Sequence, residues 1–215
     1  MEAVMGSEGV RLLGPNSSWY AVSSTSPDAV FRHFPVREVS QKPACEAFMS
    51  LRSGAMVAVV AKGLRDWTLA GGSLCLVSPS RDREDEVRSR LRRLSDEFGE
   101  AQYFANYGGT NLYCWISARN GEVTRAFVYA GEELVNEGSR TQAEEALNWA
   151  DLETPLDIDA EDFDDEEWDK GEPFPTEVSV AVVARGWSVD PSTVWLPTSE
   201  LVLVATLGVD VVRGD

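Results

Sequence analysis

The amino-acid sequence predicts an α+β fold in which helices pack on a mainly antiparallel meander sheet, with one acidic loop insert. Short segments rich in aromatic and β-branched residues follow one another through residues 102–129. An amphipathic stripe occupies residues 82–98, and helical patterns separate the remaining short strands. Strands in meander order with helices between them are typical of α+β folds. We expect residues 1–215 to form one domain, with the acidic loop 151–175 inserted before the C-terminal helix and strands.

The first half of the chain alternates short strands with helices. Ser26 precedes Pro27, which suits the N-cap and the first position of a helix. A second helix is predicted over residues 43–51. Gly71 and Gly72 predict a turn between two strands. The strands predicted in this half cover residues 19–22, 55–61, 67–70 and 74–77.

The helical pattern of residues 82–98 is the most regular in the chain. Four apolar residues at spacings of four, three and four form one stripe, made of Val87, Leu91, Leu94 and Phe98. Acids stand four residues before arginines on the outer face, in the pairs Glu84–Arg88 and Glu86–Arg90. Six acids balance six arginines between residues 81 and 98, so the pattern predicts a solvated, neutral helix rather than a nucleic-acid patch.

A strand meander is predicted after Gly99, which ends that helix. Asn120 and Gly121 form the strongest hairpin signal, because both residues tolerate the positive φ of a type I′ turn. Thr141 and Glu144 form a capping box that opens a helix through residue 149. The remaining predicted elements are strands 102–107, 111–118 and 122–129, a helix 176–185 closed by Gly186, and strands 187–189 and 201–205.

The net charge is concentrated in one segment. The whole chain has 36 acids and 19 Lys and Arg residues, a formal charge of −17. Residues 151–172 hold twelve of the acids and one base, which is −11, so the other 193 residues, with 24 acids and 18 bases, carry only −6. Like-charge repulsion opposes compact structure within such a run. Two aromatic residues, Phe163 and Trp168, interrupt it.

Charge and composition exclude several function classes. A strongly acidic chain is a poor ligand for nucleic acid or for an anionic membrane surface. The single histidine, His33, excludes multi-histidine metal sites, and the three cysteines have no zinc or disulfide spacing. The longest apolar run has seven residues, and residues 1–10 do not resemble a secretory signal. We therefore expect a soluble cytoplasmic protein without cofactor or metal.

No catalytic motif emerges from the spacing of reactive residues. Cys45 and His33 are the only cysteine–histidine candidates, and a packing role for His33 is the simpler interpretation. No G-x-S-x-G elbow or phosphate loop occurs. A calcium loop starting at Asp157 fails at its sixth and twelfth positions, which leaves only weak divalent binding by carboxylates open. Four polar residues punctuate apolar strands and are the candidates for an enzyme cleft over the sheet: Asp66, Tyr103, Tyr113 and Arg125.

Three segments carry a resemblance to bacterial proteins of immunity type, which neutralise a toxin. They are residues 94–104 (LSDEFGEAQYF), the hairpin 120–129 (NGEVTRAFVY) and residues 187–191 (WSVDP). The chain resembles such proteins over about its middle half. The resemblance implies an α+β domain that acts by binding, and it carries over no catalytic residue.

The first functional hypothesis is therefore a non-enzymatic cytoplasmic binding protein, an inhibitor that covers the basic surface of a toxin enzyme. Acidic surfaces of this kind steer association with a basic partner, and buried aromatic residues anchor interfaces. The alternatives are an enzyme of unknown reaction, and an interaction protein whose acidic loop serves solubility alone. Phe163 and Trp168 would, in that last case, simply hold the loop to its own domain. The predicted partner-binding residues are Asp157, Asp159, Glu161, Asp162, Phe163, Asp164, Asp165, Glu166, Glu167, Trp168 and Asp169.

Overall fold

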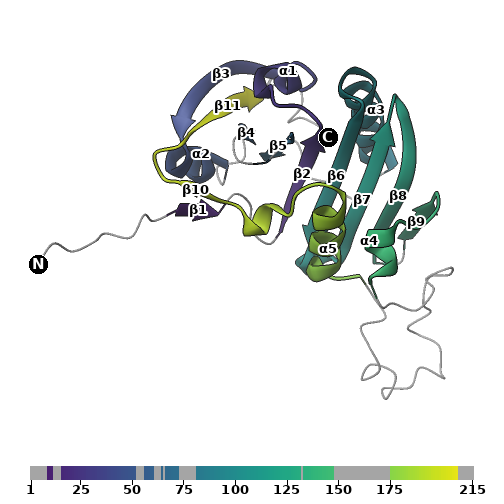
Figure 1. The fold of residues 1–215 in the computed structure, drawn as a ribbon. Helices are drawn as coiled ribbons and strands as arrows, with labels where there is room; N and C mark the ends of the chain where they lie inside the picture. Colours follow the sequence, from purple (N-terminus) through teal and green to yellow (C-terminus); the bar gives the residue numbers. More distant parts are fainter. Residues whose placement is uncertain are drawn as a thin grey trace, which may run out of the picture.

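The computed structural model describes residues 9–11, 16–51, 56–60, 64, 66–72, 81–131, 133–147 and 175–207. The predicted α+β class is confirmed (Figure 1). Nine antiparallel strands form one sheet in the order β3-β11-β4-β5-β2-β6-β7-β8-β9, and β1 pairs with β10 in a separate ribbon. The strands are β1 Gly9–Arg11, β2 Ser17–Val22, β3 Val36–Pro43, β4 Met56–Val60, β5 Thr68–Gly72, β6 Glu100–Tyr107, β7 Leu112–Arg119, β8 Glu122–Ala130, β9 Glu133–Glu137, β10 Trp195–Pro197 and β11 Leu201–Leu207.

Helices cover both faces of the nine-stranded sheet (Figure 1). The helices are α1 Pro27–Phe31, α2 Ala44–Leu51, α3 Arg81–Phe98, α4 Gln142–Glu145 and α5 Glu177–Trp187, with 3-10 turns at Gly108–Thr110 and Pro191–Thr193. On one face, α1 and α3 pack against the sheet, and the apolar stripe of α3 is buried in the core between them. On the other face, α2 and α5 contribute to a second core that contains the buried Trp19 and Trp115. The sheet is therefore the middle of three layers.

An aromatic row crosses four neighbouring strands on the α5 face. Trp19, Phe104, Trp115 and Phe127 are opposite one another in the strand register. The rings of Trp115 and Phe127 stack with centroids 4.2 Å apart, and those of Trp19 and Phe104 stack at 5.2 Å. Large rings that stack across strands supply much of the burial in a sheet core. This row fixes the floor on which α5 packs.

Local signals in the sequence are confirmed at several turns. The Ser26 hydroxyl accepts a hydrogen bond from the Ala29 N–H at the start of α1. Asn120 and Gly121 have φ of 48° and 82°, as the type I′ hairpin requires. Gly99 has a φ of 84° directly after α3. The predicted capping box at Thr141 is present, and Thr176 forms a second one with Ser179 at the start of α5, which was not predicted.

Three other predictions are wrong. Gly71 and Gly72 are not a turn but lie within β5, where Gly71 is opposite Trp19 on β2. Gly186 does not end a helix: it lies inside α5. The missing side chain lets Ala143 of α4 approach, since a Cβ on Gly186 would clash with it. Trp187 is consequently the last residue of α5 and not the start of a strand. Small residues at these places permit close packing rather than a change of direction.

The extent of some predicted elements also changes. The helix that starts after Thr141 has four residues, Gln142–Glu145, instead of continuing to residue 149. Two strands that the sequence did not predict, β3 and β9, form the two edges of the sheet. The predicted strand 74–77 lies outside the described residues.

Candidate functional site

The α5 face of the sheet carries a groove of about 500 Å³ beside α4. Strands β6, β7 and β8 form its base, and the contact between α4 and α5 forms one wall. The residues that line it are Glu100, Ser117, Arg119, Thr124, Arg125, Ser139, Thr141, Gln142, Ala143, Gly186 and Trp187. Polar side chains make up most of this lining, as a site for binding or chemistry would require.

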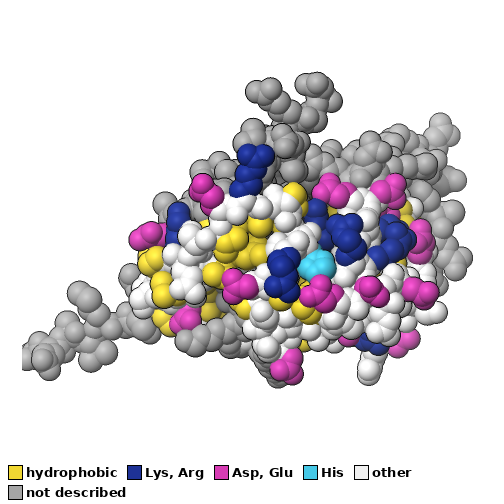
Figure 2. All heavy atoms as spheres, turned by 90° about the horizontal axis from the view of Figure 1, so that it is seen from above, with side chains coloured by type: hydrophobic (Ala, Val, Ile, Leu, Met, Phe, Trp, Pro, Cys, Tyr) yellow, Lys and Arg dark blue, Asp and Glu magenta, His cyan; other side chains and the backbone are white. Residues whose placement is uncertain are grey.

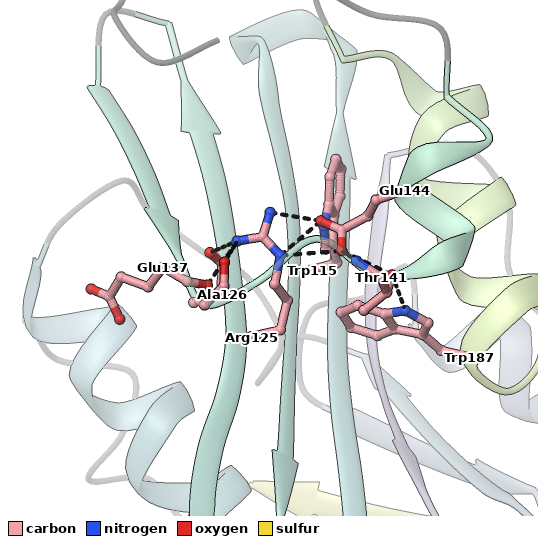
Figure 3. A network of polar contacts seen from close by, with 8 residues as sticks. Trp115, Arg125, Ala126, Glu137, Thr141, Glu144 and Trp187 are labelled. Carbon is pink, nitrogen blue, oxygen red and sulfur yellow. Dashed lines mark hydrogen bonds and ion pairs between the residues drawn. The ribbon is translucent and has the colours of Figure 1, made fainter. Parts of the chain in front are cut away.

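Arg125 of β8, in the base of the groove, forms a buried ion pair with Glu144 of α4 (Figure 3). The side chains are 3% and 1% exposed. Arg125 Nη2 lies 2.7 Å from Glu144 Oε1, and Arg125 Nε donates to both carboxylate oxygens, at 2.8 and 3.1 Å. Arg125 Nη1 donates to the backbone carbonyl oxygens of Ala126 at 2.9 Å and Glu137 at 2.7 Å. All three guanidinium nitrogens are thus engaged.

The carboxylate of Glu144 is equally well coordinated. The indole N–H of Trp115 donates to Glu144 Oε1 at 2.8 Å. The backbone N–H and the hydroxyl of Thr141 donate to Oε2 at 2.8 and 2.9 Å. The indole N–H of Trp187 donates to the Thr141 hydroxyl at 2.9 Å, which extends the network to α5 (Figure 3). A fully hydrogen-bonded buried network of this kind holds its elements in one arrangement.

The environment of Glu144 keeps it ionised. Burial on its own would raise the pKa of this carboxyl group. The hydrogen bonds from Arg125, Trp115 and the Thr141 N–H outweigh burial, and the pKa of Glu144 is lowered. An ionised carboxylate with its oxygens occupied is a poor general acid or base near neutral pH. We infer that the ion pair holds α4 and the end of β9 against β8.

The four residues predicted for an enzyme cleft do not come together. Only Arg125 lines the groove. Tyr113 lies in the core of the same face, where its ring faces Tyr129, whereas Tyr103 packs against Tyr20 in the core of the opposite face. Asp66 is exposed in a turn before β5. The sequence could not show this division, because it depends on strand register.

The cysteine–histidine pair is also separated. His33, at the end of α1, is bonded to Glu97 at 2.8 Å and lies against Phe98 of α3. Cys45 is exposed on α2, which packs on the other face of the sheet. Cys114, the other cysteine in the described part of the chain, is buried, and burial raises the pKa of its thiol. His33 therefore has the packing role that the simpler interpretation gave it.

The predicted partner-binding residues, 157–169, lie outside the described residues, so their role stays a prediction. Sequence reasoning missed Glu144 as a partner of Arg125. It identified Glu144 only as the third position of the capping box, and that signal was correct, since Glu144 Oε2 accepts from the Thr141 N–H. If Glu144 had been predicted to be buried, a basic partner would also have been predicted, because a buried carboxylate requires a counter-charge.

Comparisons with family models, curated proteins and solved structures found no match to this chain. No helix in the described part of the chain has the length and apolar character needed to cross a membrane. Within the same residues, no three His, Cys, Asp or Glu side chains gather where they could hold a metal ion.

The lowered pKa of Glu144 predicts a specific pH dependence of stability. A carboxyl group with a depressed folded-state pKa stabilises the fold above its unfolded pKa, about 4.3, and loses that contribution as pH falls through the folded value. The difference in the free energy of unfolding between wild type and Glu144→Gln should therefore be full at pH 6 and shrink below about pH 4. Urea unfolding of both proteins between pH 3 and 7 measures this. A constant difference across that range would contradict the assignment.

Proposed function

We propose that this chain is a non-enzymatic binding protein of immunity or inhibitor type. Its acidic segment, residues 151–172, would contact the basic surface of a toxin enzyme and neutralise it. The observation that carries the proposal is where this segment is attached. In the chain it lies between α4 and α5, and these two helices contact each other and α5 packs on the sheet (Figure 1).

The contact between α4 and α5 is close enough to act as a firm base. Gly186 has no side chain at the point where Ala143 approaches. The hydrogen bond between Trp187 and Thr141 joins the two helices, and Glu144 joins α4 to Arg125 of the sheet. Pro175, which precedes the N-cap residue Thr176 of α5, is buried. The described helices on either side of the acidic segment are therefore held in defined positions, which would lower the ordering cost of a contact made near them.

The charge of the segment suits a basic partner. A charge of −11 within 22 residues produces a strong local field, while the remaining 193 residues carry only −6. Fields of this kind raise association rates and suppress wrong partners more than they raise affinity. Phe163 and Trp168 provide the apolar anchors that such an interface needs.

The chemistry of the groove supports binding rather than catalysis. The buried acid and base of this face neutralise one another, and none of the other residues predicted for an enzyme cleft lines the groove. Catalytic groups require hydrogen-bonding capacity that remains available to a substrate. In the Arg125–Glu144 pair, that capacity is used by the protein itself.

The test begins with affinity capture of the partner from the source organism, followed by binding kinetics with the purified pair. One variant neutralises four acids in the segment: Asp165→Asn, Glu166→Gln, Glu167→Gln and Asp169→Asn. A matched control neutralises four exposed acids elsewhere: Glu38→Gln, Asp66→Asn, Glu122→Gln and Glu145→Gln. The first should slow association by about tenfold at low salt, and the control by less than about twofold.

Two results would contradict the proposal. Equal slowing by both variants would mean that the segment makes no specific contact and contributes only to the overall charge of the protein. A captured enzyme whose activity is unchanged at saturation with this protein would rule out the inhibitor function. A toxin gene directly beside this one would identify the enzyme to assay first.

A further inference from the structure

A second groove, of about 630 Å³, lies on the opposite face of the fold, between the end of α1 and the middle of α3. Its lining residues are Arg32, His33, Phe34, Pro35, Glu86, Ser89, Arg90 and Arg93. Three arginines and the only histidine thus meet in a protein whose net charge is −17. Figure 2 shows this face, with Lys and Arg side chains on both sides of the histidine.

Arg90 forms the rigid part of the groove. Its side chain, which the outer-face prediction placed in solvent, is only 3% exposed. Nη1 donates to the Tyr20 hydroxyl at 3.0 Å, Nη2 donates to Glu86 at 2.7 Å, and the guanidinium lies 5.1 Å from the Phe34 ring centre. Its buried Nε–H has no acceptor among the described residues. The protein fixes this cation and leaves part of its hydrogen-bonding capacity unused.

The other two arginines are less fully paired than Arg90. Arg93 is exposed and donates to the Ser89 hydroxyl at 2.9 Å, and it has no carboxylate partner among the described residues. Arg32 is 68% exposed and comes no closer than 3.6 Å to Glu97. Glu97 itself accepts the shorter contact from His33, at 2.8 Å. Two guanidinium groups on different helices therefore border the groove with donors available to a ligand.

The charge balance and the walls of the groove indicate which ligand fits. The three arginines and Glu86 leave +2 on the lining residues, with His33 counted as neutral, and Glu97, which contacts Arg32 and His33 beside the groove, lowers this to +1. A phosphate monoester carries about −1.5 to −2 at pH 7 and has three acceptor oxygens, which match forked arginine donors. Phe34 and Pro35 add an apolar wall beside the cations. A volume of this size accommodates a small organic molecule attached to the phosphate.

We propose that the α1–α3 groove binds a phosphate monoester whose organic part packs against Phe34 and Pro35. Arg93 and Arg32 grip the phosphate oxygens from the two sides of the groove, and Arg90 supplies a fixed positive charge behind them. This site is independent of the acidic segment, which is attached on the other face of the sheet.

Amide chemical-shift titration of the full chain tests the proposal, with phenyl phosphate and inorganic phosphate as probes. Phenyl phosphate should shift the amides of residues 32–34 and 89–93 and bind more tightly than inorganic phosphate. Arg93→Gln should weaken phenyl phosphate binding by about tenfold. Arg92→Gln is the matched control, because Arg92 is an exposed neighbour on α3 that does not line the groove, and it should retain wild-type affinity.

Three results would overturn the assignment. They are the absence of shifts at millimolar phenyl phosphate, equal weakening by Arg93→Gln and Arg92→Gln, and equal affinity for phenyl phosphate and inorganic phosphate. Thermal melting of each variant shows that it is folded. If Arg93→Gln does not fold, Arg32→Gln gives the same comparison, because the Arg32 side chain is largely in solvent.

Discussion

Replacing Glu144 with Gln is expected to lower the free energy of unfolding by about 3–5 kcal/mol at neutral pH. The amide leaves Arg125 as a buried charge without its counter-ion. It also turns an NH₂ group toward donors, since Arg125, Trp115 and Thr141 all donate to the present carboxylate. One side of the amide must therefore face a donor whichever way it is oriented. Urea unfolding at pH 7 measures the loss.

Two further variants separate the ion pair from other effects. Glu145→Gln removes an exposed neighbouring charge on α4 and should change stability by less than about 0.5 kcal/mol. The double variant Arg125→Met with Glu144→Leu removes both charges. Its loss in the free energy of unfolding should be clearly smaller than the sum of the losses for Arg125→Met alone and Glu144→Leu alone. A Glu144→Gln loss below about 1 kcal/mol, or additive single changes, would show that the pair is not the unit that holds α4 in place.

The ion pair also shows which contacts local sequence patterns do not predict. Arg125 interrupts an apolar strand, and Glu144 completes a capping box with Thr141. Each signal is a pattern within a few residues. Their pairing depends on where the chain after β9 places α4 against β8, and no local pattern encodes that path.

The regular elements were predictable for the same local reason. The stripe of α3 and the Asn120–Gly121 hairpin each specify their own structure, through helical periodicity and through positive φ. The edge strand β3 carries no such signal, because most of its residues are exposed and the alternation of apolar and polar residues is lost. Pairing with β11 on one side is what makes it a strand.

Glycine and arginine gave the misleading signals, each for a tertiary reason. Gly186 predicts a helix end, but it is a glycine because Ala143 packs against it. Gly71 predicts a turn, but it lies opposite Trp19 in the sheet. Arg90 reads as the outer member of an ion pair with Glu86. That pair exists, but Tyr20 and Phe34 enclose the guanidinium. A local rule gave the correct contact in this case and the wrong burial.

Replacing Gly138 with Ala is the second large effect we expect, a loss of about 2–5 kcal/mol in the free energy of unfolding. Gly138 has a φ of 80°, which costs a non-glycine residue about 1–2 kcal/mol. A Cβ at this position would also lie well inside contact distance of the Thr124 carbonyl oxygen and 3.3 Å from the Arg125 Cα. Such overpacking costs about 1–3 kcal/mol. The chain would have to move where the Glu137 carbonyl oxygen accepts from Arg125.

Gly131→Ala isolates the steric part of this effect. Gly131 has a φ of 65°, yet a Cβ there would meet no atom within 4 Å. It should therefore lose only the conformational cost of about 1–2 kcal/mol, measured by the same urea unfolding. Equal losses in the two variants would mean that the segment after β9 moves freely away from β8. In that case Arg125 would not depend on the carbonyl oxygen of Glu137, and the ion pair with Glu144 would hold α4 to the sheet without support from β9.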